Sequence, residues 1–341
     1  MKCSILGWAK GEHPMTSIGP PVLEVRNVST HFMTRRGALK AVDDVSFTVG
    51  QREIVGLVGE SGSGKSITGF SILGLVDPPG RVVSGQILFN GEDLLKMSPS
   101  AMRTIRGKRI AMIFQDPMMT LNPVLSVGTQ MIETVQAHDK VSRAEARARS
   151  RDALGLVGIP SPEERLDAYP HQFSGGMRQR VAIAIALLHR PDLIIADEPT
   201  TALDVTIQSQ ILFEIKRLAA EFGMALIWIS HDLGVVAALA DRLMVMYAGR
   251  IVEAGKVDGV LSEPRHPYTS GLLSAIPAAV PRGEPLRPIP GFAPSPLSRP
   301  SGCAFRDRCV RATDICVTEP MLEIAAGREF RCFHPYLWSA A

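Results

Sequence analysis

The 341-residue sequence contains no apolar run of membrane-spanning length. A helix needs at least about 18 consecutive apolar residues to cross a bilayer. The longest candidate here, from Val181 to Leu188, has only the length of a buried helix segment. Any role of this chain at a membrane therefore requires a partner that spans it.

A strong charge of either sign is also lacking. The 37 Lys and Arg residues nearly balance 34 Asp and Glu residues, for a net charge of +3. With 45% hydrophobic and 21% charged residues, the composition is that of an ordinary globular protein. Because nucleic-acid-binding domains usually carry a broad basic surface, we expect no nucleic-acid partner.

The first residues lack the pattern of a secretory signal. Residues 1–21 include Lys2 and Lys10 but no sustained apolar stretch before a small-residue cleavage site. We interpret them as a flexible N-terminal extension, with Met15 as an alternative start.

Cysteine is scarce too. Of the five cysteines, Cys3 stands alone and the other four lie between Cys303 and Cys332. In a reducing cytosol such a cluster indicates a metal or iron–sulfur site rather than disulfides.

The sequence does contain one complete phosphate-binding loop, Gly-Glu-Ser-Gly-Ser-Gly-Lys-Ser at residues 59–66. It lies between an apolar strand at 54–58 and a helix from Ile67, the context that this motif requires. Glycines let successive backbone N–H groups turn inward around phosphate oxygens. The pattern predicts that Lys65 reaches the β- and γ-phosphates of ATP, that Ser66 holds Mg²⁺, and that the helix dipole assists. The predicted ATP-binding residues of this segment are Gly59, Glu60, Ser61, Gly62, Ser63, Gly64, Lys65, Ser66 and Ile67.

Alternating strands and a helical insert frame this loop. Residues 22–28 and 41–49 alternate in polarity and predict an antiparallel layer. In the strand–turn region after the first of these segments, Phe32 is a candidate platform for the adenine ring, although ordinary packing would explain it equally well. Residues 127–190 have helical periods and no strand-like run, so we expect a helical insert in an α/β core. The other predicted strands are 84–91, 110–114, 193–197 and 225–229.

Polar residues lie at the ends of two of the predicted buried strands. Asp197 ends one strand and suits a water-mediated grip on Mg²⁺, while Glu198 can orient the attacking water. Two acids at this position are unfavourable to bury without a cation, which argues against an ordinary strand end. His231 follows the next strand, at the edge where ligands bind in open α/β sheets. Separately, Ser174, Gly175 and Gly176 begin a helix and form either a second anion site or only a cap.

Taken in order, these motifs resemble the complete set of an ATP-binding-cassette (ABC) ATPase, over roughly residues 22–256. The motifs are residues 59–66, Gln115, residues 174–179, 193–198 and 202–204, and His231. The resemblance implies a P-loop NTPase α/β fold, with a RecA-like mostly parallel sheet, an antiparallel β subdomain and a helical subdomain. It implies catalytic roles for Glu198, His231, Gln115 and Lys65, and Mg²⁺ binding by Ser66, Gln115 and Asp197. It further implies that Ser174, Gly175, Gly176, Gln179 and Asp204 face ATP bound to a second cassette.

Three further segments are similar to the oligopeptide/dipeptide importer branch of this family: residues 169–180, 266–273 and 302–309. The branch implies an ATPase at the cytoplasmic face of the membrane, which pairs with a second and often different cassette. Its other partners are two membrane permease subunits and, indirectly, an extracytoplasmic peptide-binding protein. Relatives in the branch import nickel, glutathione or other solutes, which leaves the substrate open. A soluble cassette acting on nucleic acid or ribosomes usually has a coiled-coil insertion or two cassettes, and neither is present.

We expect the ABC ATPase domain at residues 22–262, with its helical subdomain at about 116–190, and a C-terminal extension at 263–341. Prolines are frequent from 264 to 300, which predicts an extended wrapping segment. The spacing Cys303-x₅-Cys309-x₆-Cys316-x₁₅-Cys332 can satisfy either Zn²⁺ or a [4Fe–4S] cluster. The resemblance favours [4Fe–4S] over zinc or empty thiols. The expected role of the metal centre is structural, to hold the short extension together, with redox or iron sensing as the alternative.

Overall fold

The structure is a computed structural model that describes residues 19–201, 203–276 and 288–337. Most of the predicted N-terminal extension, including Cys3 and Met15, lies outside these described residues, and so does Ala202 of the predicted motif at 202–204. The predicted fold class is confirmed: an ABC cassette with a mixed core sheet and an antiparallel subdomain.

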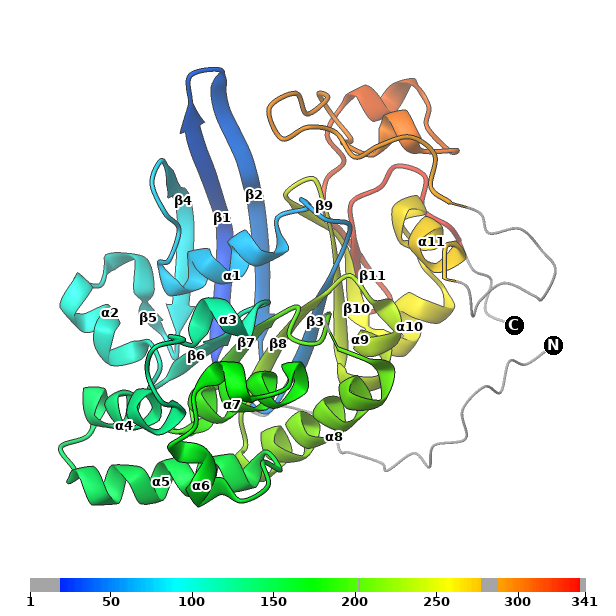
Figure 1. The fold of residues 1–341 in the computed structure, drawn as a ribbon. Coiled ribbons are helices and arrows are strands. Elements are labelled where there is room, and N and C mark those ends of the chain that lie inside the picture. Colours follow the sequence, from blue (N-terminus) through cyan, green and yellow to red (C-terminus); the bar gives the residue numbers. More distant parts are fainter. Residues whose placement is uncertain (1–18, 202, 277–287, 338–341) are drawn as a thin grey trace.

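Strands β1 and β2 of the antiparallel layer precede the phosphate loop, as the alternating pattern predicts, whereas β4 and β5 of the same layer follow the loop (Figure 1). Strand β1 pairs with both β2 and β4, and the order in this four-stranded sheet is β2-β1-β4-β5. Every second side chain of β1 near its start is buried, which gives the sheet one apolar face. The strands are β1 (Leu23–Thr34), β2 (Gly37–Val49), β4 (Gly80–Phe89) and β5 (Glu92–Asp93).

The larger sheet has eight strands in the order β11-β12-β10-β9-β3-β8-β7-β6. Its parallel strands consist of buried residues on both faces, which is why their sequences are apolar throughout rather than alternating. The strands are β3 (Ile54–Val58), β6 (Ile110–Ile113), β7 (Leu193–Asp197), β8 (Ala225–Ser230), β9 (Arg242–Tyr247), β10 (Arg250–Lys256), β11 (Glu323–Ala325) and β12 (Arg328–Phe330).

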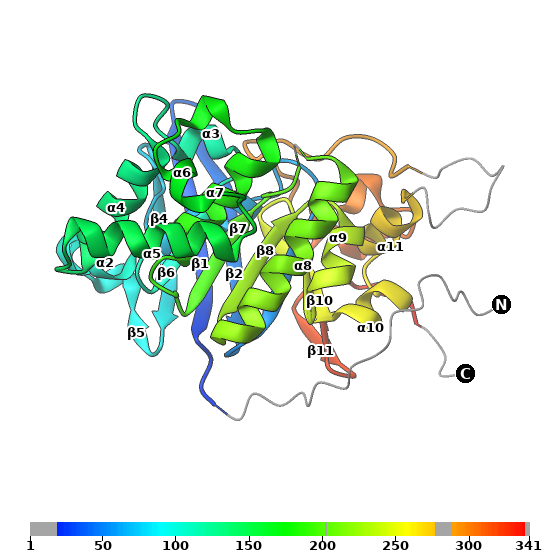
Figure 2. The same ribbon diagram turned by 60° about the horizontal axis from the view of Figure 1, so that its bottom comes forward.

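Two apolar cores cover opposite faces of the larger sheet. On β8, Leu226 and Trp228 belong to the core shared with α8 and α9, whereas Ile227 and Ile229 belong to the core shared with α1 and the antiparallel sheet. The period of two in a strand explains this division. Figure 2 shows α8 and α9 in front of the sheet and β1 and β2 behind it. The helices that cover the sheet are α1 (Lys65–Leu73), α8 (Val205–Phe222), α9 (Leu233–Leu239) and α10 (Val257–Ser262), with α2 (Pro99–Ile105) and the 3₁₀ turn η1 (Leu94–Lys96) beside β4 and β5.

Between β6 and β7 the chain is helical. Ser126, Ser142 and Ser174 each cap a helix there by accepting a backbone N–H with the hydroxyl oxygen. The charged helix α5 is largely solvent-exposed on its Arg-rich side, where Arg147 pairs with Glu163 and Asp167. The helices are α3 (Pro117–Thr120), α4 (Val127–His138), α5 (Arg143–Leu156), α6 (Pro162–Leu166), η2 (Pro170–Gln172) and α7 (Gly175–Leu187). None of the described helices, here or elsewhere, combines the length and apolarity that a membrane span requires.

The C-terminal extension is more ordered than its proline content predicts. Helix α11 (Pro267–Ser274) interrupts the expected extended segment, with Pro267 at a helix start that tolerates it. His266 caps this helix by accepting the Tyr268 N–H with Nδ1, and complete burial lowers the pKa of His266 to about 3. The turns η4 (Arg306–Arg308) and η5 (Asp314–Val317) follow. The β11–β12 hairpin then joins the core sheet, because β12 pairs with β10.

Candidate functional site

The phosphate loop has the backbone that its glycines allow. Gly59, Gly62 and Gly64 have φ values of 154°, 77° and 106°. Space is limiting as well, because a Cβ on Gly64 would lie 2.3 Å from the Ala41 carbonyl oxygen. Only glycine fits at that position without a shift of the backbone.

Lys65 begins α1 and lies inside the loop. Its Nζ donates hydrogen bonds to the carbonyl oxygens of Gly59, at 2.8 Å, and of Glu60, at 3.0 Å. Burial lowers the pKa of Lys65, and the nearby carboxylates of Glu198 and Asp197 oppose this shift. The ammonium is thus held where a triphosphate in the loop would meet it.

Two of the predicted Mg²⁺ residues lie together. The Ser66 hydroxyl, from α1, donates to Asp197 Oδ1 at the end of β7 over 2.9 Å. Burial raises the pKa of Asp197, and the hydrogen bond from Ser66 opposes it. A hydroxyl and a carboxylate beside a phosphate loop are the oxygen ligands that Mg²⁺ prefers, so the residues present fit this ion.

The other predicted catalytic side chains converge on one atom, Oε2 of Glu198. Gln115 donates to it with Nε2 at 3.3 Å, and Nδ1 of His231 lies 3.0 Å away. Thr201 also donates to it, at 3.1 Å. Glu198 itself has a φ of 44°, a left-handed conformation uncommon outside glycine and often found at functional sites.

Sheet topology explains this convergence. Strands β6, β7 and β8 are neighbours and all parallel, so their carboxyl ends lie at one edge. Gln115, Glu198 and His231 each follow the end of one of these strands. Sequence reasoning missed Thr201, although a hydroxyl three residues after Glu198 was an available signal.

The residues predicted to face a second cassette lie at the starts of α7 and α8. Ser174 is exposed and caps α7 by accepting the Met177 N–H at 3.3 Å. Asp204 caps α8 through two backbone N–H groups. Gly176 packs against Ile207 of α8, because an added Cβ would lie 2.8 Å from that side chain. Gly175 is exposed and Gln179 is buried, and the role of these five residues across an interface stays a prediction.

Phe32 lies on β1, opposite Leu39 of β2 and Gly80 of β4. Its ring lies against Gly80, where an added Cβ would be 2.5 Å from Cε1. One face of the ring therefore has a packing role, and its contact with adenine stays a prediction.

The four tail cysteines line one small cavity, together with Phe305. All four are free thiols. Backbone N–H groups of Arg311 and His334 donate to Sγ of Cys309 and Cys332, at 3.4 and 3.3 Å. Burial raises the pKa of Cys332 to about 12. Within the described ranges, no group of three or more His, Cys, Asp or Glu residues is arranged to hold a metal ion.

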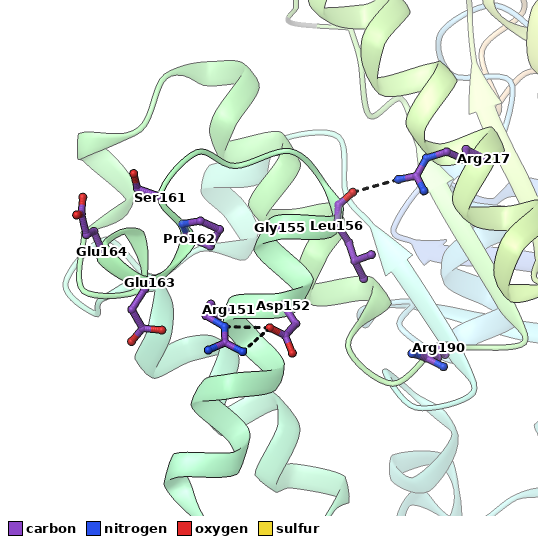
Figure 3. Close-up of a pocket in the computed structure, with 10 residues that line it drawn as sticks. All are labelled: Arg151, Asp152, Gly155, Leu156, Ser161, Pro162, Glu163, Glu164, Arg190 and Arg217. Carbon is purple, nitrogen blue, oxygen red and sulfur yellow. Dashed lines mark hydrogen bonds and ion pairs between the residues drawn. The ribbon is translucent and has the colours of Figure 1, made fainter.

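Figure 3 shows a surface depression lined by residues of α5 and α6, with Arg217 from α8. Arg151 pairs there with the adjacent Asp152, and Arg217 donates to the Leu156 carbonyl oxygen. None of the motif residues described above lines it. The convergence of charged groups at the strand ends, rather than this depression, is the candidate active site.

Comparisons with known proteins identify the family of this chain. Residues 42–201 match the "ABC transporter" family model, and residues 252–316 match "Oligopeptide/dipeptide transporter, C-terminal region". The chain is 48% identical to the dipeptide transport ATP-binding protein DppD of Escherichia coli over 92% of this chain and 97% of that one. It is also 48% identical to the oligopeptide transport ATP-binding protein OppD of Salmonella typhimurium, over 92% and 94%.

A solved structure is similar as well. It is a dimeric ATP-binding cassette in a post-hydrolysis state bound to ADP and phosphate. The match has a TM-score of 0.62 and 26% sequence identity, and it covers 69% of this chain and 98% of that one.

Proposed function

The chain belongs to the ATP-binding proteins of the oligopeptide/dipeptide ABC transporters, and we propose that it drives peptide import by closing on ATP together with a second cassette. It is the ATPase subunit of such an importer. The observation that carries the mechanism is the convergence of Gln115, Thr201 and His231 on Glu198, beside the phosphate loop.

In this proposal Glu198 is the general base. Its Oε2 is the acceptor for a proton of the attacking water, and Gln115 and Thr201 orient the carboxylate through their hydrogen bonds. His231 contacts the γ-phosphate, and Lys65 compensates the negative charge on the phosphates. Phosphoryl transfer depends mainly on such positioning and charge stabilisation.

Ser66 and Asp197 would hold Mg²⁺, with Gln115 as the third predicted residue. When bound, this ion neutralises charge on the phosphate oxygens. Asp197 accepts the Ser66 hydrogen bond in the chain as described, so both side chains already face the same point.

We propose that Ser174 to Gly176, with Gln179 and Asp204, complete the ATP site of the second cassette. Exposure of Ser174 and Gly175 at a helix start supports this, because such a start offers free N–H groups to an anion. The dimeric cassette that resembles this chain provides a precedent for pairing. The second subunit would be a different cassette, and two membrane permease subunits would contact the region near Gln115 and the inserted helices at the cytoplasmic face.

The test is a reconstituted complex. This chain, co-expressed with its neighbouring cassette, permease and binding-protein genes, should co-purify with the membrane subunits. Its ATP hydrolysis should rise when a di- or oligopeptide-loaded binding protein is added. Co-purification without any stimulation by peptides, and with stimulation by nickel or glutathione instead, would contradict the peptide assignment. A complex that does not form at all would contradict the transport role.

We further propose that the four tail cysteines hold a [4Fe–4S] cluster as a structural staple. The convergence of four thiols on one cavity supports it, as do the N–H groups that donate to two sulfurs. Among the described residues, no group of three or more His, Cys, Asp or Glu side chains is already arranged to hold a metal ion, so the proposal depends on the convergence of the four thiols on one cavity, and Zn²⁺ is the alternative. The raised pKa of Cys332 means that its thiol must lose its proton when metal binds.

Protein purified without oxygen should contain iron and sulfide in near-equal amounts. Cys332→Ala should lose most of both, while Cys3→Ala, a change outside the cluster, should retain them. Zinc in place of iron would support the alternative metal, and equal iron in the two variants would contradict the site. Equal ATPase activity with and without the cluster would argue against a sensing role.

A further inference from the structure

Glu60, the second residue of the phosphate loop, is held by two side chains of the C-terminal extension. The Tyr268 hydroxyl accepts the backbone N–H of Glu60 at 2.9 Å. Arg308 donates to both oxygens of the Glu60 carboxylate, at 2.7 and 3.0 Å. A bidentate guanidinium–carboxylate pair fixes the orientation of the carboxylate as well as compensating its charge. One loop residue is therefore restrained in both its main chain and its side chain.

A cluster of aromatic rings holds the Tyr268 hydroxyl and the Arg308 guanidinium in place. The rings of Tyr247 and Tyr268 lie 4.5 Å apart, and Phe305 is 5.3 Å from each of them. These three residues are at most 3% exposed. The Arg308 guanidinium lies over the Tyr247 ring at 5.8 Å and also donates to the Tyr247 hydroxyl at 3.3 Å. Neither Tyr268 nor Arg308 can leave Glu60 without disturbing this packing.

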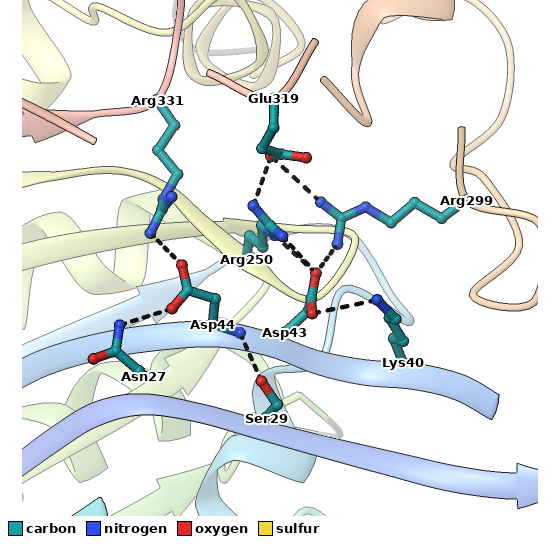
Figure 4. Close-up of polar contacts among 9 residues, drawn as sticks. All are labelled: Asn27, Ser29, Lys40, Asp43, Asp44, Arg250, Arg299, Glu319 and Arg331. Carbon is teal, nitrogen blue, oxygen red and sulfur yellow. Dashed lines mark hydrogen bonds and ion pairs between the residues drawn. The ribbon is translucent and has the colours of Figure 1, made fainter. Parts of the chain in front are cut away.

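The extension is anchored to the cassette independently of Glu60 (Figure 4). Arg299 pairs with Asp43 of β2 at 2.8 Å, and Arg331 pairs with Asp44 at 3.0 Å. Burial works against ionisation of Asp43, but hydrogen bonding from Arg250 holds the pKa of its carboxyl below the ordinary value. The position of Arg308 thus follows from the docking of the whole extension.

Glu60 in turn contacts Lys65, the residue predicted to reach the phosphates. The Glu60 carbonyl oxygen accepts a hydrogen bond from Lys65 Nζ at 3.0 Å. Charge matters as well, since a free Glu60 carboxylate would repel a triphosphate bound in the same loop. Arg308 compensates that charge with a side chain only 6% exposed, where water screens little.

We infer that Arg308 and Tyr268 are positioning residues of the ATP site, which hold Glu60 so that the loop and Lys65 are set for the triphosphate. The inference rests on the proposed function, since it concerns the same site. It gives the extension a task in nucleotide binding in addition to the metal binding that we propose for its cysteines. Arg308 lies between Cys303 and Cys309, so the fold of the cysteine unit sets the position of the guanidinium.

The test uses the complete complex and measures ATP hydrolysis against ATP concentration. Arg308→Met should raise KM for ATP about tenfold with kcat nearly unchanged, because it removes binding common to ground and transition states. The KM of Arg308→Lys should lie between those of the wild type and of Arg308→Met, since one ammonium replaces a bidentate contact. The matched control is Arg306→Met in the same turn, because Arg306 bonds to Ser301 and Asp307 and should leave KM unchanged.

A second variant separates charge pairing from loss of packing. Glu60→Gln, added to Arg308→Met, should recover most of the lost affinity because the uncompensated carboxylate is gone. A purely structural role of Arg308 predicts no recovery. Tyr268→Phe keeps the ring and removes one acceptor, so it should raise KM about threefold even if Arg308→Met fails to fold.

The outcomes distinguish this inference from the proposed function. Wild-type KM in both Arg308→Met and Tyr268→Phe would overturn the inference while leaving the ATPase intact. If the wild-type complex did not hydrolyse ATP, the proposed function would fail. Equilibrium dialysis of ATP with the isolated full chain would then decide the inference. Weaker ATP binding by Arg308→Met and Tyr268→Phe than by the wild type would support it, and equal binding would overturn it.

Discussion

Replacement of Glu198 by Gln should reduce ATP turnover by between about 100-fold and 10,000-fold, the usual contribution of a general base. ATP binding should persist, because the amide oxygen still accepts the hydrogen bonds of Gln115 and Thr201 that now end on Oε2. Without a base the water is not activated, so the two cassettes should remain closed over ATP. Phosphate release by the purified complex, with ATP retention measured in parallel, checks both parts.

Glu163→Gln is the matched control. Glu163 is an exposed carboxylate on α6 that pairs with Arg147 of α5 and makes no contact with Glu198 among the pairs described. The same chemical change there should leave turnover within about twofold, as is usual for surface ion pairs. A normal rate of hydrolysis in Glu198→Gln would show that another group accepts the proton.

Replacement of Lys65 by Met should weaken ATP binding at least about hundredfold. Loss of one partner from a buried charge pair removes about 3 kcal/mol, and each 1.4 kcal/mol is a factor of ten. Lys65 is only 5% exposed, so little water can replace its ammonium inside the loop. Equilibrium dialysis with labelled ATP measures the change directly.

Lys108→Met provides the comparison for this second variant. Lys108 pairs with Asp139 at 3.0 Å, with its side chain 43% exposed. Its removal should leave ATP affinity unchanged, because a screened surface charge contributes little. Undiminished ATP binding by Lys65→Met would mean that the loop does not hold the triphosphate.

Local patterns were sufficient to predict the phosphate loop and the ends of the core strands. The loop is one contiguous segment, and its glycines carry the conformations that the motif requires. The apolar runs of β7 and β8 predicted buried parallel strands, and topology then brought Glu198 and His231 together. Such contacts follow from the rule that parallel strands end at the same edge of a sheet.

The extension was the part that local patterns described least well. Prolines predicted an extended segment, but Pro267 starts helix α11, because a first-turn proline needs no N–H partner. The β11–β12 hairpin joins the core sheet through the edge strand β10. Its three-residue strands are too short to give a strong alternating signal, since strands of about five residues are usual.

The sequence by itself predicted a phosphate loop for ATP and determined that an acid and a histidine follow one another at the ends of buried strands. Only the tertiary structure decided that Tyr268 and Arg308 support that loop from residues 208 and 248 positions away. The physical reason is that loop chemistry is encoded in consecutive residues, whereas a contact between distant segments depends on how their apolar faces pack. No local period or propensity specifies that packing.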